Sequence, residues 1–350
     1  MDQAFPTTES FMYQTMHRQP QDLANLLDGG WADAEQAAAL IAEASRIWVV
    51  GIGTSYHAAI VGGWLLRSTD RDARSVTSFD FATYPDQFPI RAGDAVIIQA
   101  HTGVKSYSAL AMNRAVEAGV PVISIGSNSA EHPGSQFILR TCEREKSAAY
   151  TTSHLCAMAR LAQLAVCLGS ADLRPSLEAL PSHIADVLSR QGEIEPIAVD
   201  AATRHVYAIG AGPNEATALE FVIKAREAAL HPVDGLGLEQ FFHGPIVAAQ
   251  EGDFGLVVSA SGPSAPRTAA VATALADIGC TVWSVGDADP GIDGASHFAV
   301  PPVHELISPL LNVVPIQLFA YHLAATRGTH PDRFRKEDQV YVDAFSLLTL

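Results

Sequence analysis

The sequence predicts an α/β protein made of two duplicated, doubly wound parallel-sheet domains that follow a helical N-terminal segment. Glycine turns recur along the chain: Gly51 and Gly53 correspond to Gly210 and Gly212, 159 residues further on. The same spacing relates AGDAVIIQAHTG to EGDFGLVVSASG, and a spacing of 160 relates EAGVPVISIG to DIGCTVWSVG. Each segment reads as an apolar strand next to a glycine turn, the pattern of strand–helix units with a parallel sheet. Three matches at nearly one spacing indicate two copies of one domain.

The elements follow in order along the chain. Two helices are expected over residues 8–28 and 31–44, a strand near residues 75–79, and a long helix over residues 147–168. At about 100–200 residues per domain, a chain of 350 residues holds two domains. The expected parts are N-terminal helices (1–45), a first domain (46–170), a partly helical linker (171–202), a second domain (203–330) and a polar C-terminal tail (331–350).

Composition excludes several classes of protein. The chain is 48% hydrophobic, yet no run approaches the ~20 apolar residues that a membrane helix needs. The first residues lack a basic segment followed by an apolar one, so no secretion signal is predicted. The four cysteines show no C-x-x-C pair or zinc spacing, which favours reduced thiols. A net charge of −16 argues against a nucleic-acid surface. We therefore expect a cytoplasmic protein that binds neither membrane nor nucleic acid.

Residues 216–245 carry the strongest candidate for catalytic chemistry. On a helix that turns about 100° per residue, Thr217, Glu220, Lys224 and Glu227 fall within roughly 80° of one another among apolar residues. A narrow charged stripe on an apolar helix is typical of a helix that faces a cleft or another subunit. The alternative is an ordinary i, i+4 ion pair between Glu220 and Lys224, worth about 0.3–0.5 kcal/mol, together with an ordinary loop histidine.

The segment after this helix carries a candidate histidine. The helix is expected to end near His231, because Pro232 lacks a backbone donor and disfavours helical angles in the residue before it. We interpret GLGLEQFFHGP, which follows, as a loop with Glu239 and His243 at its far end. Its two adjacent phenylalanines would be costly to expose, so we expect both to be buried, in their own domain or against a partner.

A candidate anion site lies where two strands of the first domain end. AHTGVKSYS, residues 100–108, links a strand to a helix, and Thr54 and Ser55 follow the glycine turn of the neighbouring strand. Hydroxyls and free amides at a helix N-terminus suit a phosphate, and a lysine adds a positive charge. The alternative is that these hydroxyls only cap helices. Because two adjacent loops carry them, we favour an anion site; the second copy's SASGPSAPR has two prolines without donors, and we expect that site to be empty.

The glycine turns do not predict a nucleotide cofactor. The third glycine of the dinucleotide fingerprint is replaced by Tyr56 in GIGTSY and by Glu215 in GAGPNE. No cofactor and no metal are expected. The turns still bring backbone amides to the carboxyl ends of the strands, where ligands of open parallel sheets bind.

The chain resembles the sugar isomerase (SIS) domain family of flavodoxin-like double-domain proteins along nearly its whole length. It is most similar to the isomerase half of glutamine:fructose-6-phosphate amidotransferase and to stand-alone aminosugar-phosphate deaminases and fructosamine-phosphate deglycases. The motifs that carry the resemblance are FMYQTMHRQP, GTSYHAA, ALEFVIKAREAALHP, EQFFHGP and VPIQLFAYHLAATRGTHPD. The HGP tripeptide at this spacing from a Glu-bearing helix is specific, and the GTS turn is moderately so.

The resemblance implies roles for individual residues. Glu227 is implied as the acid/base that moves a proton between C1 and C2 of an open-chain sugar phosphate, beside Glu220 and Lys224. His243 is implied to assist ring opening or proton transfer, from a loop that reaches a partner subunit, so that a homodimer with shared active sites is expected. The implied substrate- and phosphate-binding residues are Gly53, Thr54, Ser55, His101, Thr102, Gly103, Lys105 and Ser106.

Two departures from the family pattern bear on the substrate. The usual S-x-S-G-x-T phosphate loop is AHTGVK here, which loses hydroxyls and gains a cation. Where the amidotransferase has a ring-opening lysine in its tail, this chain has Asp338 or Gln339, with Lys336 close by. We expect a phosphosugar isomerase, deaminase or deglycase that acts on a phosphorylated amino sugar or fructosamine. The alternative is a non-catalytic sugar-phosphate-binding sensor.

Overall fold

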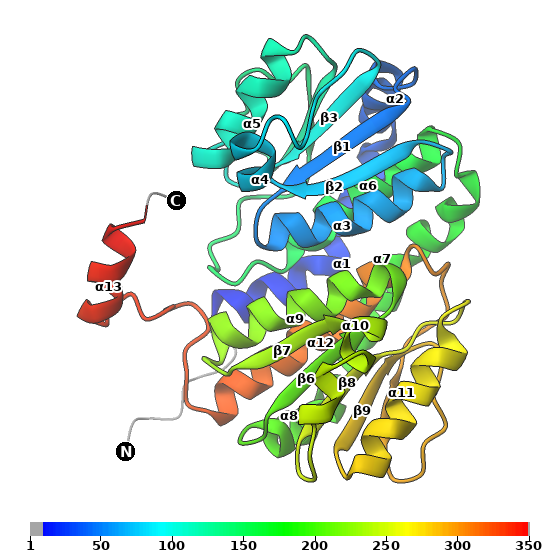
Figure 1. Ribbon diagram of the computed structural model, residues 1–350, viewed down its shortest axis with the longest axis vertical. Coiled ribbons are helices and arrows are strands. Elements are labelled where there is room, and N and C mark those ends of the chain that lie inside the picture. The colour runs from blue at the N-terminus through cyan, green and yellow to red at the C-terminus, as the bar shows by residue number, and fades with distance from the viewer. Residues whose placement is uncertain (1–9, 349–350) are drawn as a thin grey trace. The chain divides into compact units, whose positions relative to one another are not determined.

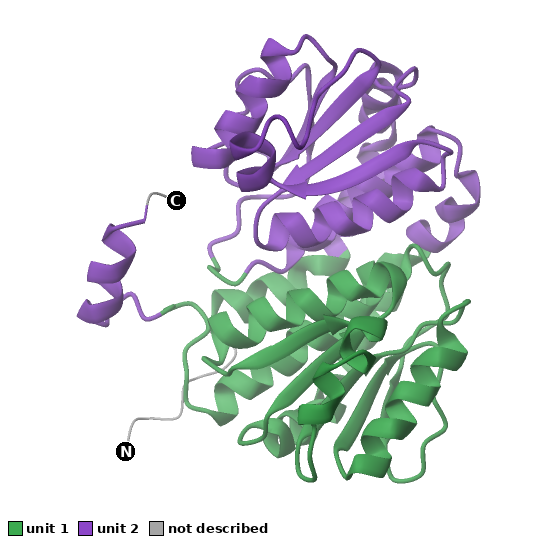
Figure 2. Cartoon of the chain, in the orientation of Figure 1, with its two compact units in different colours: residues 1–20, 147–149, 179–334 green, residues 21–146, 150–178, 335–350 purple. Residues whose placement is uncertain are grey.

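The computed structural model describes residues 10–348, which form two compact units (Figure 2). Within the described range, unit 1 comprises residues 10–20, 147–149 and 179–334, and unit 2 comprises residues 21–146, 150–178 and 335–348. Each unit is built around one five-stranded parallel sheet. Among residues 10–348, no helix has both the length and the apolar character that crossing a membrane requires.

The two sheets have the same topology, which confirms the predicted duplication. The order is β2-β1-β3-β4-β5 in unit 2 and β7-β6-β8-β9-β10 in unit 1, so each first strand lies between the second and the third. The register is also repeated: Arg46 pairs with Asp94 in one sheet, and Val206 pairs with Phe254 in the other. The strands are β1 (Arg46–Gly51), β2 (Asp72–Thr77), β3 (Asp94–Gln99), β4 (Val122–Gly126), β5 (Phe137–Arg140), β6 (Val206–Gly210), β7 (Val233–Gly237), β8 (Phe254–Val258), β9 (Thr281–Gly286) and β10 (Ser296–Ala299).

In unit 2, helices cover both faces of the sheet (Figure 1). On one face, Trp48, Val96 and Ile98 pack against α4 (Ser78–Thr83) and α5 (Ser106–Glu117). The other face carries α3 (Thr54–Arg67) and α6 (Thr152–Cys167), with α2 (Trp31–Leu40) packed on α6. Because side chains alternate along a strand, Gln99, at the end of β3, points to the α3 and α6 face.

Unit 1 repeats this layered arrangement (Figure 1). Phe319 of α12 (Ser308–Thr326) packs against Phe221 of α9 (Glu215–Ala228), with ring centroids 5.2 Å apart, and against Trp283 of β9, at 4.9 Å. On the opposite face, Tyr207 packs against Phe241 of α10 (Leu238–Phe242), and the same core includes residues of α11 (Ala265–Ile278). The remaining α-helices are α1 (Phe11–Gly29), α7 (Arg174–Ser189), α8 (Glu195–Ala201) and α13 (Gln339–Ser346).

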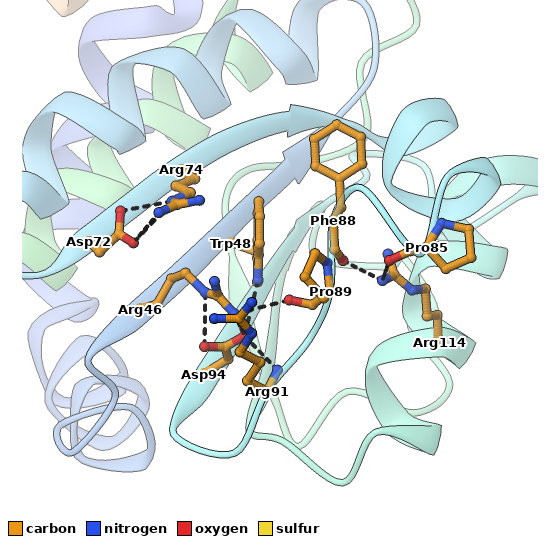
Figure 3. A network of polar contacts seen from close by, with 10 residues as sticks. All are labelled: Arg46, Trp48, Asp72, Arg74, Pro85, Phe88, Pro89, Arg91, Asp94 and Arg114. Carbon is orange, nitrogen blue, oxygen red and sulfur yellow. Dashed lines mark hydrogen bonds and ion pairs between the residues drawn. The ribbon is translucent and has the colours of Figure 1, made fainter.

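A buried carboxylate organises the sheet edge of unit 2 at which the strands begin (Figure 3). Asp94 is 4% exposed and accepts hydrogen bonds from Arg46 Nε (2.9 Å), Trp48 Nε1 (3.2 Å) and the Arg91 amide (2.8 Å). Asp253, the equivalent residue of unit 1, accepts from the Gln250 amide at 3.0 Å. The repeated Gly-Asp pair therefore marks a conformation shared by the two copies.

Two expected helix boundaries were wrong, each for a local reason. The helix expected over 147–168 begins at Thr152, where the Glu145 carboxylate accepts the amides of Thr151 and Ser153 at 2.9–3.1 Å and so satisfies its first donors. The charged helix ends at Ala228, not near His231. Leu230 has a φ of 50°, which turns the chain back before Pro232 is reached.

The expected loop GLGLEQFFHGP was also wrong. The chain forms strand β7 and then helix α10; a turn at His243 and Gly244 follows, and Pro245 starts a 3-10 helix. Pairing with β6 supplies the backbone partners of β7, from Val233 to Gly237. Leu238 and Phe241 anchor α10 in the core, at 4% and 0% exposure, so this segment is a packed part of unit 1.

Candidate functional site

A buried lysine between two carboxylates forms the chemical centre of unit 1. Lys224 Nζ lies 3.3 Å from Glu220 Oε1 and 3.0 Å from Glu227 Oε2, all on α9. Glu220 and Lys224 are fully buried, and Thr217, on the same stripe, is 2% exposed. The ion pair foreseen as the plain alternative does exist, but it is buried, unlike an ordinary pair on a helix surface.

The electrostatics of this cluster keep the lysine charged. Burial disfavours the ammonium form, but the two carboxylates outweigh this cost and raise the pKa of Lys224. One ammonium between two carboxylates leaves the cluster with a net negative charge when all three groups are ionised. The lysine therefore acts as a fixed positive charge beside Glu227, and a proton donor role for it is disfavoured.

The two glutamates differ in access. The Glu220 side chain is 0% exposed, whereas the Glu227 side chain is 32% exposed. Only Glu227 of this pair can reach a molecule that comes from solvent. Helix periodicity alone could not show which of the two carboxylates is accessible to solvent, whereas the structure does.

His243 lies on the surface of unit 1, in a cluster of charged side chains. Its Nε2 atom is 3.2 Å from Glu239 Oε2, and the His243 side chain is 71% exposed. Arg267 Nε also binds Glu239, and the Arg267 guanidinium lies 4.4 Å from the centre of the Phe242 ring. Of the two phenylalanines expected to be buried, Phe241 is in the core, but Phe242 is 38% exposed.

Unit 2 contains a cleft of about 380 Å³ at the carboxyl ends of its strands, a size that suits a small ligand. Six of the eight predicted phosphate-binding residues line it. These are Ser55, His101, Thr102, Gly103, Lys105 and Ser106. Thr54 lines a smaller adjoining cavity. Gly53 lines neither; its φ of 57° makes the turn that starts α3.

The cleft lies at the N-terminus of α5, and one hydroxyl there acts as a cap. Ser108 Oγ accepts from the Lys105 amide (2.8 Å) and donates to the Lys105 carbonyl (2.7 Å). The capping alternative therefore holds for Ser108, although Ser108 lines the cleft together with Thr102 and Ser106. His101 Nε2 accepts from the Glu145 amide at 3.2 Å, which ties the loop to the segment before α6.

The matching loop of unit 1 faces a carboxylate that the sequence did not point to. Glu305 lies beside Gly262, the counterpart of Gly103, so closely that a Cβ on Gly262 would be 2.6 Å from Glu305 Oε2. Ser264 Oγ lies 3.5 Å from Glu305 Oε1. A negative charge at this position opposes an anionic ligand. Glu305 lies 43 positions beyond Gly262 in the numbering (262 to 305), so no local motif could have revealed the contact.

Other residues of the unit 2 cleft also escaped sequence reasoning. Tyr150 lines both the cleft and the adjoining cavity, and its ring centroid is 5.3 Å from that of His101. Phe79 and Tyr107 also line the cleft. Phe79 and Tyr150 lie outside the predicted loops, on segments that are distant in sequence. Tyr107 lies within AHTGVKSYS, but it is not among the residues of that segment that were predicted to bind the anion. In the tail, Asp338 caps α13 by accepting from the Val340 amide at 3.2 Å.

The predicted site residues thus fall into two groups, one in each unit. Glu220, Lys224, Glu227 and His243 belong to unit 1. The predicted phosphate-binding residues belong to unit 2.

Comparisons with known proteins agree with this architecture. The SIS domain family matches residues 40–167. The chain is 27% identical over 339 residues to a glutamine–fructose-6-phosphate aminotransferase (isomerizing) of Pyrococcus horikoshii, covering 93% of this chain and 56% of that protein. The chain therefore spans just over half the length of this relative.

Solved structures share the whole fold. The C-terminal domain of glucosamine-fructose-6-phosphate aminotransferase from Francisella tularensis superposes with a TM-score of 0.86 at 17% identity, covering 93% of this chain and 98% of that one. A glucosamine-6-phosphate deaminase from Thermotoga maritima superposes with a TM-score of 0.74 at 18% identity, covering 93% and 97%.

Proposed function

Because this chain is a SIS-domain protein, we propose that it is a phosphosugar enzyme: an isomerase, deaminase or deglycase of a phosphorylated amino sugar or fructosamine. The proposed reaction moves a proton between C1 and C2 of the open-chain sugar. The relatives support this class, since one is named as an isomerizing aminotransferase of fructose 6-phosphate and a neighbour in fold as a glucosamine-6-phosphate deaminase.

The observation that carries the proposal is the partly exposed Glu227 beside the buried Lys224. Proton removal next to a carbonyl or imine needs an ionised carboxylate that can reach carbon. The Lys224 ammonium, 3.0 Å from Glu227 Oε2, favours that ionised form. Glu220, fully buried on the other side of Lys224, holds the ammonium in place and completes the triad.

The phosphate is assigned to the cleft of unit 2. Lys105 offers a positive charge, Thr102 and Ser106 offer hydroxyls, and the first turn of α5 offers backbone amides. These groups replace the serine-rich loop of the resembled family with fewer hydroxyls and one cation. His243 is assigned to ring opening or to proton transfer at the sugar oxygens. Its 71% exposure leaves it available to a second subunit, which supports a shared site in a homodimer.

The test is a screen of phosphorylated amino sugars and fructosamines for isomerisation or for release of ammonia or an amine, followed by the Glu227→Gln variant. This change keeps the side-chain shape and removes the base, so turnover should fall by about 10²-fold or more while binding persists. Glu251→Gln, at an exposed position of the same unit, is the matched control and should keep normal turnover.

Three outcomes would contradict the proposal in different ways. Normal turnover by Glu227→Gln would remove Glu227 from the mechanism. Binding without any turnover by the wild-type chain would favour the sensor function. Absence of binding to every phosphorylated sugar would remove the substrate class itself.

A further inference from the structure

A small cavity adjoins the cleft of unit 2, on the sheet face covered by α3 and α6. Its size is about 20 Å³, which is room for little more than one oxygen-sized group. Five residues line both spaces, so that the cavity opens beside the cleft. They are Ser55, Gln99, Ala100, His101 and Tyr150.

Gln99 is the unusual member of this lining. Its side chain is 2% exposed, and neither its amide oxygen nor its amide nitrogen has a hydrogen-bond partner among the described residues. An unpaired buried amide costs roughly as much as a lost hydrogen bond on each side. Buried polar groups are normally paired, so an amide that lines a cavity at the edge of a ligand cleft points to a ligand atom as its partner.

We propose that Gln99 is a specificity-determining residue that hydrogen-bonds one hydroxyl group of the bound sugar. This inference rests on the proposed phosphosugar function. A hydroxyl both donates and accepts, which matches the two halves of an amide. A phosphate monoester is mostly dianionic at neutral pH and so mainly accepts hydrogen bonds, and it is too large for a cavity of this size. The phosphate would therefore occupy the main cleft, and one hydroxyl would enter the cavity.

The surroundings of the cavity support a neutral ligand group. Ser153, at the start of α6, lines the cavity, and its amide donates to the Glu145 carboxylate at 2.9 Å. The Thr151 amide donates to the same carboxylate at 3.0 Å. The N-terminus of α6 is therefore already neutralised by Glu145 and does not call for an anion.

The test compares wild-type protein with Gln99→Leu, a change that keeps a similar volume and removes both hydrogen-bonding atoms. Calorimetry measures binding of inorganic phosphate, of glucosamine 6-phosphate and of hexose 6-phosphates that each lack one hydroxyl. The variant should bind inorganic phosphate normally and the complete sugar phosphate about tenfold more weakly. One deoxy ligand should bind both proteins equally, because its missing hydroxyl is the one that Gln99 contacts.

Ser124→Ala is the matched control. Ser124 is a second fully buried residue of this sheet whose hydroxyl has no partner among the described residues, but it does not line the cavity. Its removal should leave every affinity unchanged. Circular dichroism would confirm that both variants fold.

The outcomes separate the two proposals. If the wild-type chain binds no sugar phosphate, the proposed function fails and this inference falls with it. If the wild-type chain binds sugar phosphates and Gln99→Leu binds them equally well, only this inference is overturned, and Gln99 then contacts water. Equal weakening of phosphate and sugar phosphate would likewise overturn it, since the effect would be on the cleft as a whole.

Discussion

At the scale of single residues, His132 links the packing of the unit 2 cleft to pH. It is 4% exposed and packs against Gly126, which lines the small cavity, so closely that a Cβ on Gly126 would be 2.3 Å from His132 Nε2. Burial, together with the positive charge of Arg140, lowers the pKa of His132 to about 4. This histidine therefore stays neutral in the folded chain at physiological pH.

This shift predicts an acid-dependent loss of stability. An unfolded histidine has a pKa of about 6.5, so the unfolded chain binds the proton more readily than the folded chain. The stabilisation is fully present above about pH 6.5 and is lost as the pH falls toward 4, by about 1–2 kcal/mol after allowance for solvent screening. Denaturant titrations at several pH values would measure it.

His132→Phe removes the titrating group and keeps a ring of similar size. The difference in free energy of unfolding between wild type and this variant should change with pH between 6.5 and 4. Ser124→Ala, a change at another buried position of unit 2 that carries no titrating group, should show no such change. A wild-type-to-variant difference that is constant over this range would show that His132 titrates normally.

Contacts between functional side chains were predictable where the residues belong to one helix. Helix periodicity brought Glu220, Lys224 and Glu227 together, and the structure confirms their contacts at 3.0–3.3 Å. The position of Gln99 in the cavity was not predictable, because the alternation of side chains along a strand does not show which of them lines a cavity. The cavity forms only because residues of α3 and α6 line its other side.

At the scale of elements, we expect Lys105, at the N-terminus of α5, to bind the phosphate group of phosphorylated ligands. Lys105→Ala removes the cation from the cleft while Ser108 can still accept from the backbone amide of residue 105. Phosphorylated ligands should lose about 1.5–3 kcal/mol of binding free energy, whereas their unphosphorylated counterparts should bind as before. Calorimetry on matched pairs, such as glucosamine 6-phosphate and glucosamine, measures the difference.

Lys146→Ala is the control, since it removes another lysine of unit 2 that does not line the cleft. Equal weakening of both ligand types by Lys105→Ala would mean that Lys105 supports the loop and does not contact phosphate.

Strands and helices were predictable to the extent that their own residues favour them. DAVIIQ and TVWSVG are apolar and rich in β-branched residues, and both are strands. VDGLG contains two glycines and an aspartate, which individually disfavour a strand. It becomes β7 only because β6 offers an unpaired edge with a matching register from Val206 to Gly210. Tertiary pairing therefore decided the strand within the segment that was expected to be a loop.

At the scale of the whole molecule, the proposed homodimer makes a prediction about mixed subunits. An inactive Glu227→Gln protein and an inactive His243→Ala protein, mixed under conditions of subunit exchange, should regain part of the activity. Some heterodimers would then hold one site with both groups intact. Exchange should first be shown with a tagged copy, and two copies of the same variant serve as the inactive control.

An exchanging mixture that stays inactive, or an active species that sediments as a monomer, would place His243 in its own subunit or outside the reaction. The duplication itself was predictable, since the repeated spacing of 159–160 residues reproduces the repeated strand order. Which chain segments complete each unit was not, because that depends on packing between residues at opposite ends of the sequence.

Hydrogen bonds of α1 join residues that are synthesised at widely separated times. The Phe11 amide, at the start of α1, donates to Asp332 at 2.7 Å, and Gln19 Nε2 donates to Gln317 Oε1 at 2.5 Å across 298 positions. At a translation rate of about 5–20 residues per second, Gln317 would be synthesised roughly 15–60 s after Gln19. The nascent chain therefore carries α1 without Gln317 and Asp332 while both sheets are made, and that interval is open to chaperones.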